Sequence, residues 1–209
     1  MPNFGTLVFT PVIKELQERY GSRRSYARGD QASSPARLGP EEAEYIGERD
    51  SFYMATTGST GWPYIQHRGG PVGFLKVIDQ GTLAFADFRG NKQFISTGNL
   101  MTDDRVALIL VDYPRQLRLK ILGHAELREG TAATELLPQV ADPNYGATVE
   151  RVFVIKVAAF DWNCQQHITA RYTAEQIQRA LAPFEAEFAR IQQENEQLRQ
   201  RLGQTAEAG

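Results

Sequence analysis

The stretch Val72-Gly-Phe-Leu-Lys-Val-Ile-Asp-Gln-Gly-Thr-Leu-Ala-Phe-Ala-Asp-Phe88 carries the clearest signal for the fold of this chain. It consists of two short apolar runs, which predict strands at 72–79 and 82–88. Gln80-Gly81 lies between them and is typical of a tight turn. The stretch therefore predicts a pair of neighbouring antiparallel strands.

Alternating or short apolar runs with turn signals between them continue on both sides of this pair. They predict further strands at 51–57, 62–67, 105–113, 117–127 and 151–160. Helices are expected near 92–99 and 132–139. Six or seven short strands at hairpin spacing favour an antiparallel barrel over a doubly wound parallel sheet, so the predicted class is α+β.

The pattern also predicts how two of these strands are buried. The run 106–111 is apolar throughout, so we expect it to be buried on both faces. In 117–122, Leu117, Leu119 and Ile121 alternate with Arg118 and Lys120, which predicts one buried face.

The N-terminal 50 residues are expected to hold helices and a mobile arm. Thr10-Pro11 is typical of an N-cap followed by a first helical residue, and Gly21 ends that helix. A second short helix is expected from Pro40 to about Gly47. Residues 22–39 are rich in Ser, Arg, Ala and Gly without periodicity, which predicts a loop or arm. Their pattern leaves open whether they close over a ligand.

The C-terminal region, 173–203, predicts a helix beyond the barrel domain of 51–170. Thr173-Ala-Glu-Gln176 fits a capping box. The residues that follow at spacings of four and three form a heptad seam: Ile177, Leu181, Phe184, Phe188, Ile191, Asn195, Leu198 and Leu202. Pro183 is expected to break or kink the helix, which leaves a regular segment at 183–202. Two arrangements stay open: a parallel two-stranded coiled coil, or an amphipathic helix docked on its own barrel.

Composition excludes several classes of function. The 209 residues include 23 Lys and Arg against 25 Asp and Glu, so the net charge of −2 argues against a general nucleic-acid binder. The single cysteine, Cys164, excludes an internal disulfide and a multi-thiolate zinc site. The longest apolar run, 106–111, is too short to span a membrane. With no secretory signal in view, we expect a cytoplasmic protein.

Three segments have residue types suited to binding a small molecule. Arg89-Gly-Asn-Lys92 lies between a predicted strand and a predicted helix, a setting that favours a phosphate site. Gln66-His-Arg-Gly-Gly70 combines hydrogen-bonding side chains with glycines that allow close approach of a ligand. In Asp161–His167, Trp162 is suited to pack against a ring-shaped ligand, whereas Cys164 and His167 have no complementary cluster to complete a metal site.

Four blocks in order resemble the FMN-binding split barrels related to pyridoxamine 5′-phosphate oxidase. They are Gly73–Asp79, Thr82–Lys92, Asp104–Leu110 and Leu119–Glu126. Trp62–Pro71 and Asp161–Ile168 look closest to the predicted flavin-nucleotide-binding branch of that family. The resemblance covers about 50–170 and implies a split β-barrel that works as a homodimer, with FMN in clefts shared by both subunits.

The resemblance also implies roles for individual residues. Phe74, Leu75 and Lys76 would run along the flavin, and Asp87 would contact the ribityl-phosphate region. Asn91-Lys92, with Arg89 nearby, matches the pair that grips the phosphate, although Asn91 stands where the family has Arg. Arg118 falls near the ring, and Lys76, His67, Arg68 and Arg118 are candidates for tuning the flavin. The substrate-phosphate block of the oxidase is replaced by Asp161–His167.

Three hypotheses follow. The first is an FMN-dependent oxidoreductase of unknown substrate, whose electron donor is a nicotinamide or another small molecule. The second is a non-catalytic flavin- or haem-binding module, with His67, His124 and His167 as possible haem ligands. The third is an interaction protein whose coiled coil carries the function.

Overall fold

The computed structural model describes residues 3–30, 37–162 and 166–207. They form two compact units: residues up to Asp112 together with Gln116–Ile168, and residues from Thr169 onward together with Tyr113–Arg115.

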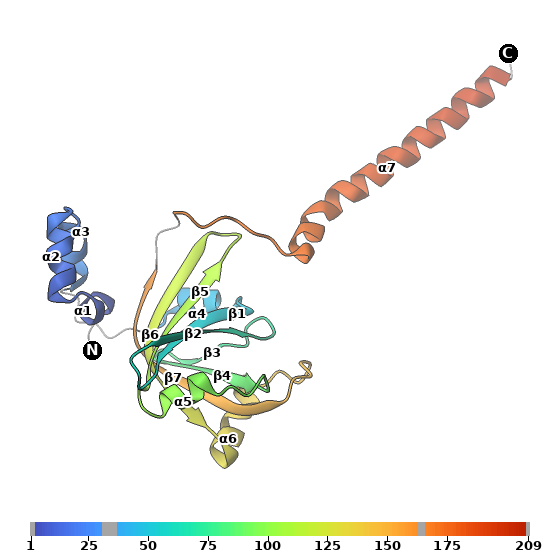
Figure 1. Ribbon diagram of the computed structural model, residues 1–209. Coiled ribbons are helices and arrows are strands. Elements are labelled where there is room, and N and C mark those ends of the chain that lie inside the picture. Colours follow the sequence, from blue (N-terminus) through green and yellow to red (C-terminus); the bar gives the residue numbers. More distant parts are fainter. Residues whose placement is uncertain (1–2, 31–36, 163–165, 208–209) are drawn as a thin grey trace. The chain divides into compact units, whose positions relative to one another are not determined.

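The first unit contains a single seven-stranded sheet that curves into a barrel (Figure 1). Its strands are β1 (Ser51–Thr57), β2 (Pro63–Gly69), β3 (Lys76–Asp79), β4 (Thr82–Phe88), β5 (Arg105–Asp112), β6 (Leu117–Arg128) and β7 (Val149–Trp162). All pairings are antiparallel, in the order β2-β1-β5-β6-β7-β4-β3. This arrangement confirms the predicted split barrel, whose open edges are β2 and β3.

Among its described residues, the same unit also contains six short helices. They are α1 (Phe4–Val8), α2 (Pro11–Arg19), α3 (Arg23–Asp30), α4 (Pro40–Gly47), α5 (Ile95–Leu100) and α6 (Gly130–Val140). In α4, Tyr45 and Ile46 are buried in the core of the barrel. The α6 residues Ala133 and Val140 cover the outer side of β4 and β7, so β4 is buried on both faces.

The inside of the barrel is aromatic. The rings of Phe85 and Phe153 stack with their centroids 4.7 Å apart, and those of Phe52 and Phe74 stack at 5.5 Å. All four side chains are buried, and they form the centre of the hydrophobic core of the barrel.

The structure corrects two predictions for the strands. β3 begins at Lys76 rather than 72, because the preceding residues form a turn in which Gly73 has a φ of +74°. β5 is buried on one face only: Val106, Leu108 and Leu110 point into the core, whereas Ala107 is exposed and Ile109 half-buried. A run of apolar residues has the same sequence pattern whether its second face is buried against the core or exposed, so the pattern cannot predict which of the two occurs.

Two helix predictions also change. Part of the expected arm, 22–39, forms α3, which is stabilised by an edge-to-face contact between Tyr26 and Phe9 at 5.5 Å; residues 31–36 of the arm lie outside the described residues. In the second unit, α7 (Ala174–Glu207) continues through Pro183. A single proline costs one backbone hydrogen bond, and a helix of 34 residues retains many others on either side.

The expected capping box is confirmed, since Thr173 and Gln176 exchange hydrogen bonds of 2.9 and 3.1 Å.

Candidate functional site

The inner side of the edge strand β2 presents polar groups. Tyr64, Gln66 and Arg68 alternate with Ile65 and His67, so the first three are half-buried and the other two are exposed on the opposite face. The alternation of a β-strand thus separates Arg68 from its neighbour His67, although the sequence places both in one candidate segment.

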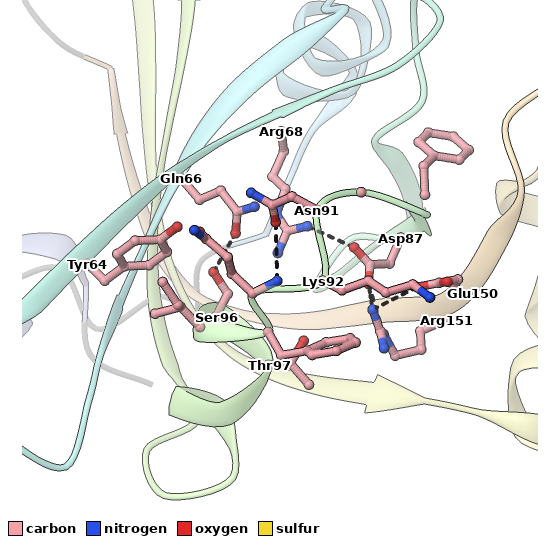
Figure 2. Close-up of a pocket in the computed structure, with 15 residues that line it drawn as sticks. Tyr64, Gln66, Arg68, Asp87, Asn91, Lys92, Ser96, Thr97, Glu150 and Arg151 are labelled. Carbon is pink, nitrogen blue, oxygen red and sulfur yellow. Dashed lines mark hydrogen bonds and ion pairs between the residues drawn. The ribbon is translucent and has the colours of Figure 1, made fainter.

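A buried carboxylate, Asp87, binds two guanidinium groups. Its Oδ1 lies 2.8 Å from the NH1 of Arg68, and its Oδ2 lies 2.9 Å from the Nε and 2.6 Å from the NH2 of Arg151. Arg151 stands directly opposite Asp87 in the β4–β7 register. Arg68 instead reaches it from β2, which has no backbone pairing with β4 in the described sheet. The Arg68–Asp87 ion pair therefore joins the edge strand β2 to β4 through side chains (Figure 2).

The environment of Arg68 is unusually apolar for a cation. Its guanidinium carbon lies 4.8 Å from the centroid of the Phe153 ring. Burial lowers the pKa of Arg68, and the nearby carboxylate of Asp87 opposes that effect. Its Nε is buried and has no hydrogen-bond partner among the described residues. A buried donor without a partner is costly, so the Asp87 ion pair and the contact with the Phe153 ring must offset that cost.

The loop between β4 and α5 forms the second side of the site. Lys92 and Phe94 have left-handed backbone conformations, with φ of 59° and 55°. Lys92 precedes α5 by three residues, whereas the sequence predicts a helix from about 92. In α5, the Oγ of Ser96 donates a 2.8 Å hydrogen bond to the Oε1 of Gln66, which ties this helix to β2.

These elements line a pocket that is open to solvent. Its empty volume is about 440 Å³, part of which is continuous with solvent. Three cations, Arg68, Lys92 and Arg151, and two carboxylates, Asp87 and Glu150, line it. Hydroxyl and amide groups from Gln66, Ser96 and Thr97 complete the wall (Figure 2). An excess of positive charge beside neutral hydrogen-bonding groups suits a phosphate or another small anion.

The pocket brings together five of the residues expected from sequence: Gln66, Arg68, Asp87, Asn91 and Lys92. The remaining candidates lie elsewhere in this chain. Phe74 and Leu75 are buried in the core, Lys76 begins β3, and Arg118 is half-buried on β6. Arg89 is exposed and forms a 2.9 Å ion pair with Glu150.

Trp162 has a structural contact rather than a place in the pocket. Its Nε1 donates a 2.8 Å hydrogen bond to Glu42, and its ring meets that of Tyr45 edge to face at 4.7 Å. These contacts hold α4 against the end of β7.

The histidines do not gather into a site. His67 is exposed and its ring lies 5.5 Å from that of Tyr53; His124 is paired with Asp104 at 2.9 Å; His167 is exposed. Cys164 lies outside the described residues. Within the described ranges, three or more potential metal ligands do not cluster anywhere.

Several pocket residues are not among those expected from the sequence: Tyr64, Ser96, Thr97, Glu150 and Arg151. Arg151 could have been suspected, because it is a cation at the start of the predicted strand 151–160, in which only Lys156 is otherwise charged. Ser96 and Thr97 follow Lys92 closely, but only the fold shows that they face β2.

Comparison with known proteins supports the fold. The family model for pyridoxamine 5′-phosphate oxidase matches residues 38–163, more than half of the chain. A histidine-to-alanine variant of HupZ from Group A Streptococcus is 19% identical, with a TM-score of 0.50, over 60% of this chain and 99% of that one. No match was found among curated protein sequences.

Other similar structures differ in what their names say they bind. An FMN-binding protein from Syntrophomonas wolfei subsp. wolfei is 15% identical, with a TM-score of 0.41, over 73% of this chain and 97% of that one. HutZ, the heme storage protein from Vibrio cholerae, is 15% identical, with a TM-score of 0.38, over 58% of this chain and 90% of that one.

Proposed function

Because the chain belongs to the pyridoxamine 5′-phosphate oxidase family, we propose that it is a flavoprotein that binds FMN and places the phosphate of FMN in the pocket beside Asp87. The observation that carries this proposal is the convergence of Arg68, Arg151 and Lys92 on one pocket.

The charges in the pocket fit a phosphate ester. Asp87 holds the two guanidinium groups in place, with side chains only 5% exposed for Asp87, 13% for Arg68 and 14% for Arg151. The carboxylate therefore pre-organises the cations but does not neutralise all of the positive charge. A phosphate would be attracted by the remaining positive charge and would gain charge-assisted hydrogen bonds from groups that need no rearrangement.

We propose that the activity is that of an oxidoreductase, because bound FMN supplies two-electron redox chemistry that side chains lack. Arg68, Arg151 and Lys92 would bind and orient the cofactor through its phosphate. The electron donor would be a nicotinamide or another small molecule that reaches the ring from the open side of the pocket.

We also propose that the barrel works as a homodimer. The β-sheet register places Tyr53 between Ile109 of β5 and His67 of β2, and Ile65 opposite Ala55, so Tyr53, Ile65 and Ile109 share the outer face of these three strands. Tyr53 is 41% and Ile65 63% exposed, a costly arrangement for neighbouring apolar side chains in water. A second copy on this face would bury them and would supply another wall for a flavin that extends from the phosphate pocket.

Replacement of Lys92 tests the placement of the phosphate. Lys92 is exposed and lies in a loop, so its removal should leave the fold intact. One charge-assisted hydrogen bond at an exposed site contributes about 1.5 kcal/mol, so Lys92→Ala should weaken FMN binding about tenfold. Asn91→Ala should show a weaker effect of the same kind, because a neutral amide binds an anion less strongly.

Riboflavin, titrated in parallel by quenching of its fluorescence, is the control, because it lacks the phosphate. Its affinity should not change in either variant. An equal loss for FMN and riboflavin would show that Lys92 has a structural role.

The absorption spectrum of the purified protein distinguishes the broader alternatives. A flavin double band supports the proposal, whereas a Soret band would assign the pocket to haem. Anaerobic reduction of the bound flavin by NADH or NADPH would support an oxidoreductase, and failure with all donors tested would favour a flavin store.

A further inference from the structure

The long helix α7 carries an apolar seam along one side. Ile177, Leu181, Phe184, Phe188, Ile191, Leu198 and Leu202 are between 43% and 72% exposed. Their spacing of four and three residues places them at alternating d and a positions of a heptad, with Asn195 at an a position. Continuity of the helix through Pro183 matters here, because it joins the seam into about seven turns without interruption.

We propose that α7 pairs with α7 of a second copy of this chain as a parallel, in-register coiled coil. Two features of the helix identify a second copy of α7 as the partner of this seam. The first is the polar residue Asn195. In a parallel pair it faces its own counterpart, and the two amides hydrogen-bond to each other; in an antiparallel pair, or against an apolar surface, it would meet only apolar groups.

The second feature is charge complementarity at the edges of the seam. Glu194 occupies a g position, and Arg199, five residues later, occupies an e position. In a parallel in-register pair, residue g of one helix lies beside residue e of the next heptad on its partner, so Glu194 and Arg199 form two symmetric ion pairs. In one copy, Glu194 pairs with Arg190 of its own helix at 2.8 Å.

The outer positions of the helix contrast with the seam. The f positions include Arg179, Gln193 and Gln200, which suit a surface that stays in water. The helix thus has one apolar stripe, which two chains can bury against each other.

Cysteine cross-linking in the full-length protein tests the proposal, with Cys164 replaced by Ser in every variant. Asn195→Cys and Leu202→Cys each place a thiol at an a position, where parallel in-register helices bring the two β-carbons within disulfide range. Under mild oxidation each should form at least about tenfold more disulfide-linked dimer than the matched outer variants Gln193→Cys and Gln200→Cys. Far-ultraviolet circular dichroism confirms that all four are folded.

The pattern of cross-linking identifies the alternatives. Two antiparallel helices could bring only one of the two a positions opposite itself, so a disulfide at just one would overturn the proposal. Equal disulfide yields at seam and outer positions would overturn the proposal as well. A folded protein that forms no disulfide at the seam would also overturn it and would indicate that α7 docks on another surface.

A charge reversal provides a second test of the parallel register. Arg199→Glu, combined with Leu202→Cys, should lower the disulfide yield, because Glu194 then faces a like charge. Adding Glu194→Arg should restore the yield, and failure to restore it would contradict the parallel pairing. Both tests use protein without flavin, so their outcome does not depend on the proposed cofactor.

Discussion

At the scale of single residues, the site depends on a carboxylate that serves both folding and binding. Asp87→Asn removes the counter-charge of Arg68 and Arg151 while keeping the side-chain shape. Loss of one partner from a buried ion cluster costs about 3 kcal/mol or more, so the melting temperature of the apoprotein should fall. The gain in melting temperature on adding FMN should be smaller than in the unchanged protein, because Arg68 and Arg151 are no longer held in place for the phosphate.

Glu150→Gln is the matched control for that substitution. Glu150 pairs with Arg89, which is exposed, and more loosely with Arg151 at 3.4 Å, so its loss should cost about 1 kcal/mol or less. Thermal shift measurements with and without FMN distinguish the two variants. An unchanged melting temperature for the Asp87→Asn apoprotein would show that the ion cluster does not stabilise the barrel.

At the scale of elements, the turn before β3 requires glycine at position 73. Gly73 has a φ of +74°, and a β-carbon built there would lie 2.7 Å from the carbonyl oxygen of Gly47 at the end of α4. Gly73→Ala should therefore destabilise the protein by about 2 kcal/mol, measured by urea unfolding. Gly47→Ala, on the other side of the same contact, is the control. A β-carbon at position 47 meets no atom within 4 Å, so the free energy of unfolding of this variant should stay the same or rise. Equal losses for both would contradict this explanation of the turn.

At the scale of the whole molecule, the barrel face and the α7 seam are two separate proposed contacts between copies. Ile65→Lys should disrupt the first and Leu198→Asp the second, yet each single variant should remain a dimer through the other contact. The double variant should be a monomer of 23.4 kDa by light scattering. Gln139→Lys adds the same charge at an exposed position of α6, so the control variant with Gln139→Lys and Leu198→Asp should still have the mass of a dimer. A dimer that survives both substitutions would exclude these two surfaces as the only contacts.

The sequence by itself determined which segments form strands and where the chain turns. Alternation and turn residues are local signals, so β1, β4 and α4 have the predicted bounds, and the buried positions Leu119 and Ile121 of β6 were correctly predicted. The tertiary structure alone decided which side chains meet. Asp87 contacts Arg68, 19 positions away, and Arg151, 64 positions away, because strand register and the closing of the barrel bring three strands together. It also decided that β5 keeps one face uncovered, since apolar residues are equally suited to a core and to an exposed contact surface.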